Sequence, residues 1–165
     1  MKKWIPLLDG ISRFFGRVGG LCLVIGCAMI VAEIIGRSFF HATFYVVDEY
    51  TGYLMGVSSF LGLSYAEQYN GHIRMELIDY LGDRFPGLVR TAKQVCYLLA
   101  IVFALYLTYV TFQLFHSSFI NNQRSYQVSE TLLAIPQAFL PLGSFALFVQ
   151  YVVNFIKLGQ KEVKA

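Results

Sequence analysis

The sequence predicts an all-α integral membrane protein with four transmembrane helices, short interfacial amphipathic helices and both termini in the cytoplasm. Three observations support this fold class: the composition, four long apolar stretches, and an uneven distribution of Lys and Arg. Hydrophobic residues make up 56% of the 165 residues and charged residues 14%, and the mean hydropathy is +0.56. A soluble domain carries roughly 25% charged residues, so much of this surface faces something other than water.

Four stretches of the chain are long and apolar enough to cross a membrane. A transmembrane helix needs about 20 apolar residues to cross about 30 Å of hydrocarbon. The stretches lie at about 18–40, 50–68, 87–119 and 138–157. None shows the two-residue alternation that is typical of a barrel strand. We therefore expect a single membrane domain of helices over residues 1–165.

The positions of Lys and Arg predict the orientation of the spans. Eleven of the 13 Lys and Arg residues lie before the first span, between the second span and the first turns of the third, or from the end of the fourth span onward. Only Arg37 and Arg124 fall on the opposite side. Because cytoplasmic loops are enriched in Lys and Arg, the N-terminus, the middle loop and the C-terminus are expected in the cytoplasm.

Two short amphipathic segments are expected to lie in the membrane interface, in contact with lipids. The first covers about residues 4–17, and helical spacing gathers its apolar side chains on one face, namely Trp4, Leu8, Ile11 and Phe15. The alternative is that this segment extends the first span into the cytoplasm. The second covers about residues 72–81, with an apolar stripe of Ile73, Leu77, Ile78 and Leu81.

The second span carries a continuous face of small residues. Gly52, Gly56, Ser59 and Gly62 recur three or four residues apart, and the first two form a GxxxG motif. In lipid, helices associate by close packing of such faces, because burial of apolar groups supplies no driving force there. The face is a candidate docking surface for a helix of a partner protein. Packing within this chain is the alternative.

Charged residues inside or beside the spans are candidate functional sites, because a charge in the membrane is costly. Glu33 lies four residues before Arg37, which suits a structural ion pair. The alternative is a carboxylate that couples protons to transport in a self-sufficient small multidrug exporter. Asp48 and Glu49 open the second span, where they suit a helix N-terminus. They are expected to cap that helix or to contact a partner protein.

The remaining polar residues indicate no catalytic chemistry. Glu67 is expected to pair with His72 or Arg74 as a structural contact. A third alternative is a haem-bearing anchor for a respiratory enzyme. Its bis-histidine site would need His41 and His116 on facing helices, whereas His41 is predicted to lie in a loop, which argues against this alternative. No metal-ligand spacing, nucleophile motif or phosphate loop occurs. The sequence thus predicts no enzyme activity and no cofactor.

Neither the cysteines nor the basic residues indicate a further function. The three cysteines all fall within apolar stretches, where they suit packing. The basic residues lie singly at the ends of segments and do not form the clustered face that binds nucleic acid. No nucleic-acid partner is expected. Pro136 and Pro141 bracket the start of the fourth span, and Pro141 removes a backbone hydrogen bond to residue 137.

Several local motifs, in this order around four spans, resemble one known family. They are Arg37 before Phe39-Phe40, the acidic pair Asp48-Glu49, Gly62, the run from Gly71 through His72, Arg74 and Glu76 to Leu77, and Pro136 followed by Pro141-Leu142-Gly143. The chain resembles the small membrane subunit, or Q subunit, of tripartite ATP-independent periplasmic (TRAP) transporters. The family often has a tryptophan just before the acidic pair, where this chain has Tyr45-Val46-Val47.

The resemblance implies a function that composition does not reveal. Such a subunit pairs with a large membrane subunit of the M type, which carries the substrate and sodium sites in a moving elevator domain. A periplasmic substrate-binding protein delivers an organic acid, such as a C4-dicarboxylate or sialic acid. The resemblance thus implies a non-catalytic subunit of the bacterial inner membrane that braces the stationary scaffold.

Overall fold

The computed structural model describes residues 5–41, 43–69, 86–127 and 129–162. These residues form the helices α1 (Ile5–Phe40), α2 (Tyr45–Gln68), α4 (Pro86–Ile120), α5 (Ala134–Gln137) and α6 (Phe139–Glu162). The described part of the chain contains no strand, apart from one isolated antiparallel bridge between Arg124 and Leu132. The described part is therefore all-α, as the sequence predicts.

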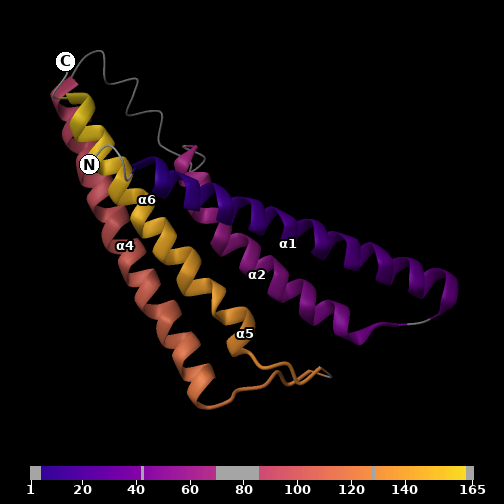
Figure 1. Ribbon diagram of the computed structural model, residues 1–165. Coiled ribbons are helices and arrows are strands. Elements are labelled where there is room, and N and C mark those ends of the chain that lie inside the picture. Colours follow the sequence, from indigo (N-terminus) through magenta and orange to yellow (C-terminus); the bar gives the residue numbers. More distant parts are fainter. Residues whose placement is uncertain (1–4, 42, 70–85, 128, 163–165) are drawn as a thin grey trace.

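The four long helices form one fan-shaped layer in the order α1, α2, α6, α4 (Figure 1). Helix α2 packs between α1 and α6, and α6 packs between α2 and α4. Both chain ends lie at one end of this layer, which we call the terminal end. The connections after α1 and after α4 lie at the other end, which we call the loop end.

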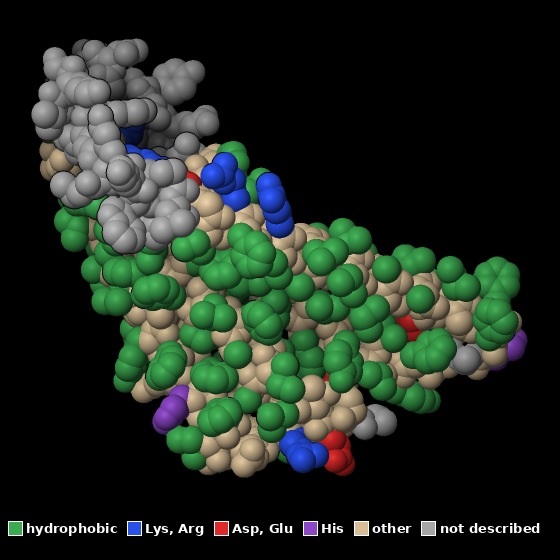
Figure 2. Space-filling view, in the orientation of Figure 1, with side chains coloured by type: hydrophobic (Ala, Val, Ile, Leu, Met, Phe, Trp, Pro, Cys, Tyr) green, Lys and Arg blue, Asp and Glu red, His purple; other side chains and the backbone are tan. Residues whose placement is uncertain are grey.

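A single layer leaves both of its faces open, so few apolar side chains are buried within the chain. The buried hydrophobic residues of the described part are mostly small or lie on α2 and α6: Val57, Leu61, Ala104, Ala134, Ala146, Leu147 and Val153. Large apolar side chains cover the outside instead, as Figure 2 shows in green. On the face in that view, Lys and Arg gather near the two ends of the layer. This distribution suits a protein surrounded by lipid.

Three helical segments of the described chain are long and apolar enough to cross a membrane: Asp9–Phe40, Thr91–Ile120 and Ala134–Lys157. They coincide with the predicted first, third and fourth spans. The predicted second span corresponds to α2, which has 24 residues but does not belong to this set. Its hydropathy is lowered by its glycines and serines and by three carboxylates, those of Asp48, Glu49 and Glu67.

The helix boundaries differ from the prediction at both ends of the chain. Residues 5–17 do not form a separate interfacial helix, because α1 runs unbroken for 36 residues from Ile5 to Phe40. The alternative, an extension of the first span, describes this segment. The fourth span begins earlier than predicted, with α5. The helix is interrupted at Ala138, since Pro141 has no N–H to donate to the carbonyl of Gln137.

The helix predicted at 72–81 lies outside the described residues, as do His72 and Arg74.

Candidate helix-docking surface

Glycines bring α1 and α2 close together. Ser12, Gly19, Gly26 and Glu33 follow one another at seven-residue intervals along α1, and all four are buried. A Cβ atom added at Gly19 would lie 3.0 Å from the carbonyl oxygen of Ser58, and one at Gly26 would lie 3.8 Å from Leu54. Small residues permit this approach of two helix backbones in lipid. Because the positions advance along α1 as they retreat along α2, the helices are antiparallel.

A second glycine brings α6 against α2. A Cβ atom added at Gly143 would overlap the backbone carbonyl of Phe60 and lie 3.0 Å from the amide nitrogen of Leu61. Farther along the same pair, the Asn154 amide donates to the Glu67 carboxylate over 2.8 Å. Positions advance together along both helices, so α2 and α6 are parallel. Helix α2 is thus held on two sides by backbone approaches at glycines.

The small-residue face of α2 points away from α1 and α6 at its glycine Cβ positions. Its residues are Gly52, Gly56, Ser59 and Gly62. A Cβ atom added at any of the three glycines would meet nothing within 4 Å. Gly52 and Ser59 are exposed and Gly56 and Gly62 are half-buried. Only the Gly62 backbone takes part in packing, with its nitrogen 3.6 Å from a Cβ added at Gly19. The face is therefore open and has room for another helix.

Glu33 and Arg37 form an ion pair within α1. The Glu33 side chain is 8% exposed, whereas that of Arg37 is 61% exposed and reaches the outside of the layer. The carboxylate thus lies in the buried row of α1 that contains Gly19 and Gly26, and it pairs with a guanidinium one turn away. This is the arrangement expected of a structural pair at a helix end.

The acidic pair of α2 does not cap the helix. Helix α2 begins at Tyr45, earlier than predicted, and its N-cap residue Phe44 makes no side-chain capping hydrogen bond. Asp48 is exposed in the first turn, while Glu49 is buried. The Glu49 carboxylate accepts hydrogen bonds from the hydroxyls of Tyr53, over 2.6 Å, and of Ser129. For Glu49 the expected capping role is therefore corrected to a contact with the connection between α4 and α5. Asp48 remains in the first turn of α2, where a negative charge suits the helix N-terminus.

That connection folds back onto α2 at the loop end. The Thr131 hydroxyl donates to the hydroxyl of Tyr50 over 3.1 Å, beside the bond from Ser129 to Glu49. The connection between α4 and α5 is therefore tied to the first turns of α2 by two side-chain hydrogen bonds.

A polar cluster joins α1 to α6 at the terminal end. Ser12 donates to Gln150 over 2.9 Å, and Gln150 donates to Asp9 over 3.3 Å. The Lys157 ammonium lies 3.0 Å from the Asp9 carboxylate. Gln150 is buried, so these bonds satisfy its amide where water is scarce. The cluster fixes the terminal end of the layer.

Sequence reasoning missed this cluster, although a signal was present. Gln150 and Asn154 lie one helical turn apart within the apolar fourth span, and polar side chains there face other helices in preference to lipid. The sequence gives no sign of the contact between Ser129 and Glu49, because a serine in a polar loop is common and does not indicate a particular partner. Glu67 receives a hydrogen bond from Asn154. Its expected partners His72 and Arg74 lie outside the described residues, so that pairing stays a prediction.

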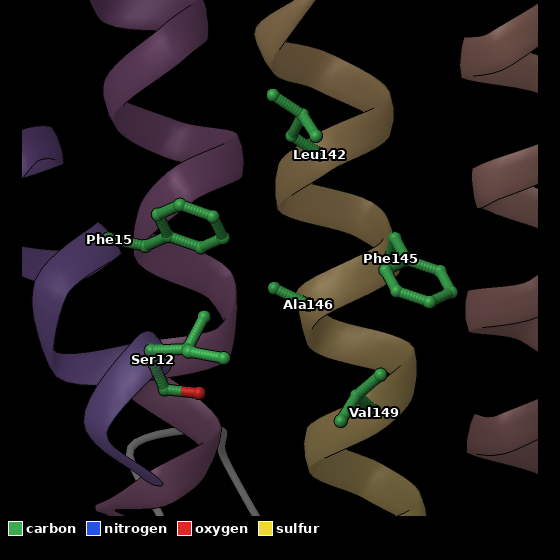
Figure 3. Close-up of a pocket in the computed structure, with 7 residues that line it drawn as sticks. Ser12, Phe15, Leu142, Phe145, Ala146 and Val149 are labelled. Carbon is green, nitrogen blue, oxygen red and sulfur yellow. The ribbon is translucent and has the colours of Figure 1, made fainter. Parts of the chain in front are cut away.

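An apolar hollow of about 160 Å³ lies between α1 and α6 (Figure 3). The residues that line it are Ile11, Ser12, Phe15, Leu142, Phe145, Ala146 and Val149. The one hydroxyl among them, that of Ser12, already donates to Gln150. The hollow therefore offers an apolar surface and no free group for chemistry.

The described residues contain no group of three or more His, Cys, Asp or Glu side chains that could hold a metal ion. His41 lies in the connection after α1, and His116 lies on α4.

Comparison with known families places the sequence in one of them. Residues 26–160 match the family of tripartite ATP-independent periplasmic transporters, DctQ component. The chain belongs to this family. The matched region of the DctQ component runs from the middle of α1 to the last turns of α6, so it contains the whole small-residue face of α2. No curated protein and no solved structure gives a significant match.

As a DctQ component, the chain is the small membrane component of a TRAP transporter, a family of transporter parts that are generally non-catalytic. This result confirms the family that the sequence motifs resemble.

Proposed function

We propose that this DctQ component is the non-catalytic small subunit of a sodium-coupled TRAP transporter for organic acids, of the C4-dicarboxylate or sialic acid type. It works with a large membrane subunit and a periplasmic substrate-binding protein in a bacterial inner membrane. Its task is to brace the stationary scaffold while the transport domain of the large subunit moves. The choice of acid belongs to the partner proteins, since this chain carries packing residues at its candidate sites.

The proposed topology has four crossings, with both termini in the cytoplasm. Helix α2 is the fourth crossing, although it is less apolar than the others. Its support is positional: α2 is antiparallel to α1 and parallel to α6, and it packs against both. Glu67 meets Asn154 at the terminal end, and Glu49 meets Ser129 at the loop end. A helix flanked in this way shares the depth of its neighbours.

The observation that carries the scaffold role is the open small-residue face of α2. In a one-layer protein, bulky apolar side chains suit a lipid-facing surface, whereas exposed glycines suit a close helix contact. The glycines at 52 and 56 leave more than 4 Å free around their Cβ positions. We therefore assign this face to the large membrane subunit.

The test is co-purification of the chain with its large membrane subunit. Gly56→Leu fills the face and is expected to reduce the recovered complex severalfold, because a bulky side chain separates the two backbones. Gly20→Leu is the matched control, since Gly20 is exposed on α1 and a Cβ there also meets nothing within 4 Å. Full recovery of the complex with Gly56→Leu would exclude this face.

The alternative of a self-sufficient, proton-coupled multidrug exporter depends on Glu33. In the structure Arg37 forms an ion pair with that carboxylate, which argues against a cycle of proton binding and release there. This alternative predicts drug transport by the chain alone and its loss in Glu33→Gln. Transport assays on vesicles that contain only this chain separate the two functions.

A further inference from the structure

Helix α4 lies at the free edge of the layer and packs against α5 and α6. Its inner face is marked by Ala104, Thr111 and Ser118, which are buried at seven-residue intervals. Thr111 and Ser144 of α6 share a hydrogen bond of 3.0 Å. This bond identifies the side of α4 that faces the layer.

The opposite side of α4 carries the polar side chains of Tyr106, Tyr109 and Gln113, which we call the α4 polar stripe, and the exposed His116 and Ser117 follow them toward the loop end. Two residues along a helix correspond to a rotation of about 200°. Tyr106 therefore points away from the direction of Ala104, and Tyr109 and Gln113 point away from that of Thr111. Both tyrosines are more than half exposed, at 65% and 59%. Gln113 is exposed as well.

The stripe lies at a depth where lipid offers no hydrogen bonds. The apolar segment Thr91–Ile120 has 30 residues, so Tyr106 lies at its midpoint. At about 1.5 Å per residue, Gln113 lies about 11 Å from that midpoint, within half of a hydrocarbon core about 30 Å thick. Headgroups are therefore out of reach for most of the stripe.

Hydrogen bonds within the stripe satisfy only some of its polar groups. Gln113 donates one amide hydrogen to the Tyr109 hydroxyl over 2.7 Å. Its carbonyl oxygen, its second amide hydrogen and the Tyr106 hydroxyl have no partner among the described residues. Polar groups left unpaired in hydrocarbon are unfavourable, so a surface of this kind indicates contact with protein.

We propose that the α4 polar stripe binds a transmembrane helix of the large membrane subunit, and that this helix presents hydrogen-bonding side chains such as Ser, Thr, Asn or Gln at the same depth. The contact extends the row of helices past α4. This inference rests on the proposed function, which supplies the partner, and it adds a second contact at a different helix from the small-residue face of α2.

The test uses the complex of the chain with its large membrane subunit. The triple variant Tyr106→Phe, Tyr109→Phe and Gln113→Leu keeps the shape of the stripe and removes its hydrogen-bonding groups. Interhelical hydrogen bonds in membranes are modest, so about a three- to tenfold loss of affinity for the large subunit is expected. Tyr126→Phe is the matched control, because it removes an exposed hydroxyl from the loop after α4. A stripe that faces lipid predicts the opposite result, unchanged or improved recovery of the complex.

Crosslinking identifies the occupant independently. With Cys22, Cys27 and Cys96 replaced by alanine, Gln113→Cys is labelled with a benzophenone maleimide and irradiated in the membrane. A product with the summed mass of the two subunits supports the proposal. A product of two copies of this chain, or only lipid adducts, overturns it. If the unsubstituted chain fails to co-purify with the large subunit, the proposed function itself fails; if it co-purifies and both stripe experiments are negative, only this inference fails.

Discussion

Gly143 illustrates how one residue sets the spacing of this layer. At this position α6 approaches the backbone of Phe60 so closely that any side chain would overlap its carbonyl group. Gly19 plays a similar part between α1 and α2. Other glycines, including Gly20 and Gly52, have open space around them. Glycine content alone therefore does not reveal which positions hold the helices together.

This difference predicts a contrast in stability. Gly143→Ala is expected to destabilise the folded chain by about 1–3 kcal/mol, because the extra methyl group forces α2 and α6 apart. Gly20→Ala is expected to be neutral or stabilising, because alanine favours a helix by up to about 1 kcal/mol over glycine and the new methyl group meets nothing. Unfolding of the purified chain in mixed detergent measures both. Equal stabilities would contradict the close approach at Gly143.

The connection between α4 and α5 shows how a loop is tied to an element distant in sequence. Its hairpin-like fold is formed by backbone hydrogen bonds, including Ser125 to Thr131 over 2.9 Å and Leu133 to Gln123 over 3.0 Å. Ser129 and Thr131 then bind the first turns of α2 through Glu49 and Tyr50. The loop therefore bridges α2 and the α4–α6 pair at the loop end.

Removal of the Glu49 carboxylate is expected to release this loop. In Glu49→Ala the hydroxyls of Tyr53 and Ser129 lose their common acceptor, and amides of residues 121–127 and 129–133 are expected to exchange with solvent faster. Asp48→Ala removes the same charge from an exposed neighbouring position and is the control. Hydrogen–deuterium exchange with mass spectrometry compares the two. Equal exchange in both variants would show that the Glu49 contacts do not hold the loop.

At the scale of the whole molecule, the single layer explains the scarcity of buried apolar residues. A compact bundle of four helices would enclose a core, whereas the order α1, α2, α6, α4 leaves both faces open. In the proposed complex, contacts with lipid and with the large subunit replace internal packing. This open arrangement supports the proposal that the chain works as a subunit and packs against another subunit of the transporter.

The number of crossings has a direct experimental consequence. Three segments pass as spans by hydropathy, which would place the two chain ends on opposite sides of the membrane. With α2 as a fourth crossing, the ends lie on the same side. Fluorescent protein fused to either terminus is expected to fold in the cytoplasm, and alkaline phosphatase inserted after Asn121 is expected to be active outside. Active alkaline phosphatase at one terminus would refute four crossings.

The sequence by itself determined the helical membrane class, the family, and the ion pair between Glu33 and Arg37, because apolar length and one-turn spacing are local properties of the chain. It also identified the small residues of α2. Only the tertiary structure decided which small residues are covered, that Glu49 binds a loop residue, and that α4 turns a polar stripe outward. These outcomes depend on which helix lies next to which. A row of small residues at seven-residue intervals marks a face of one helix, but it does not say which other helix covers that face.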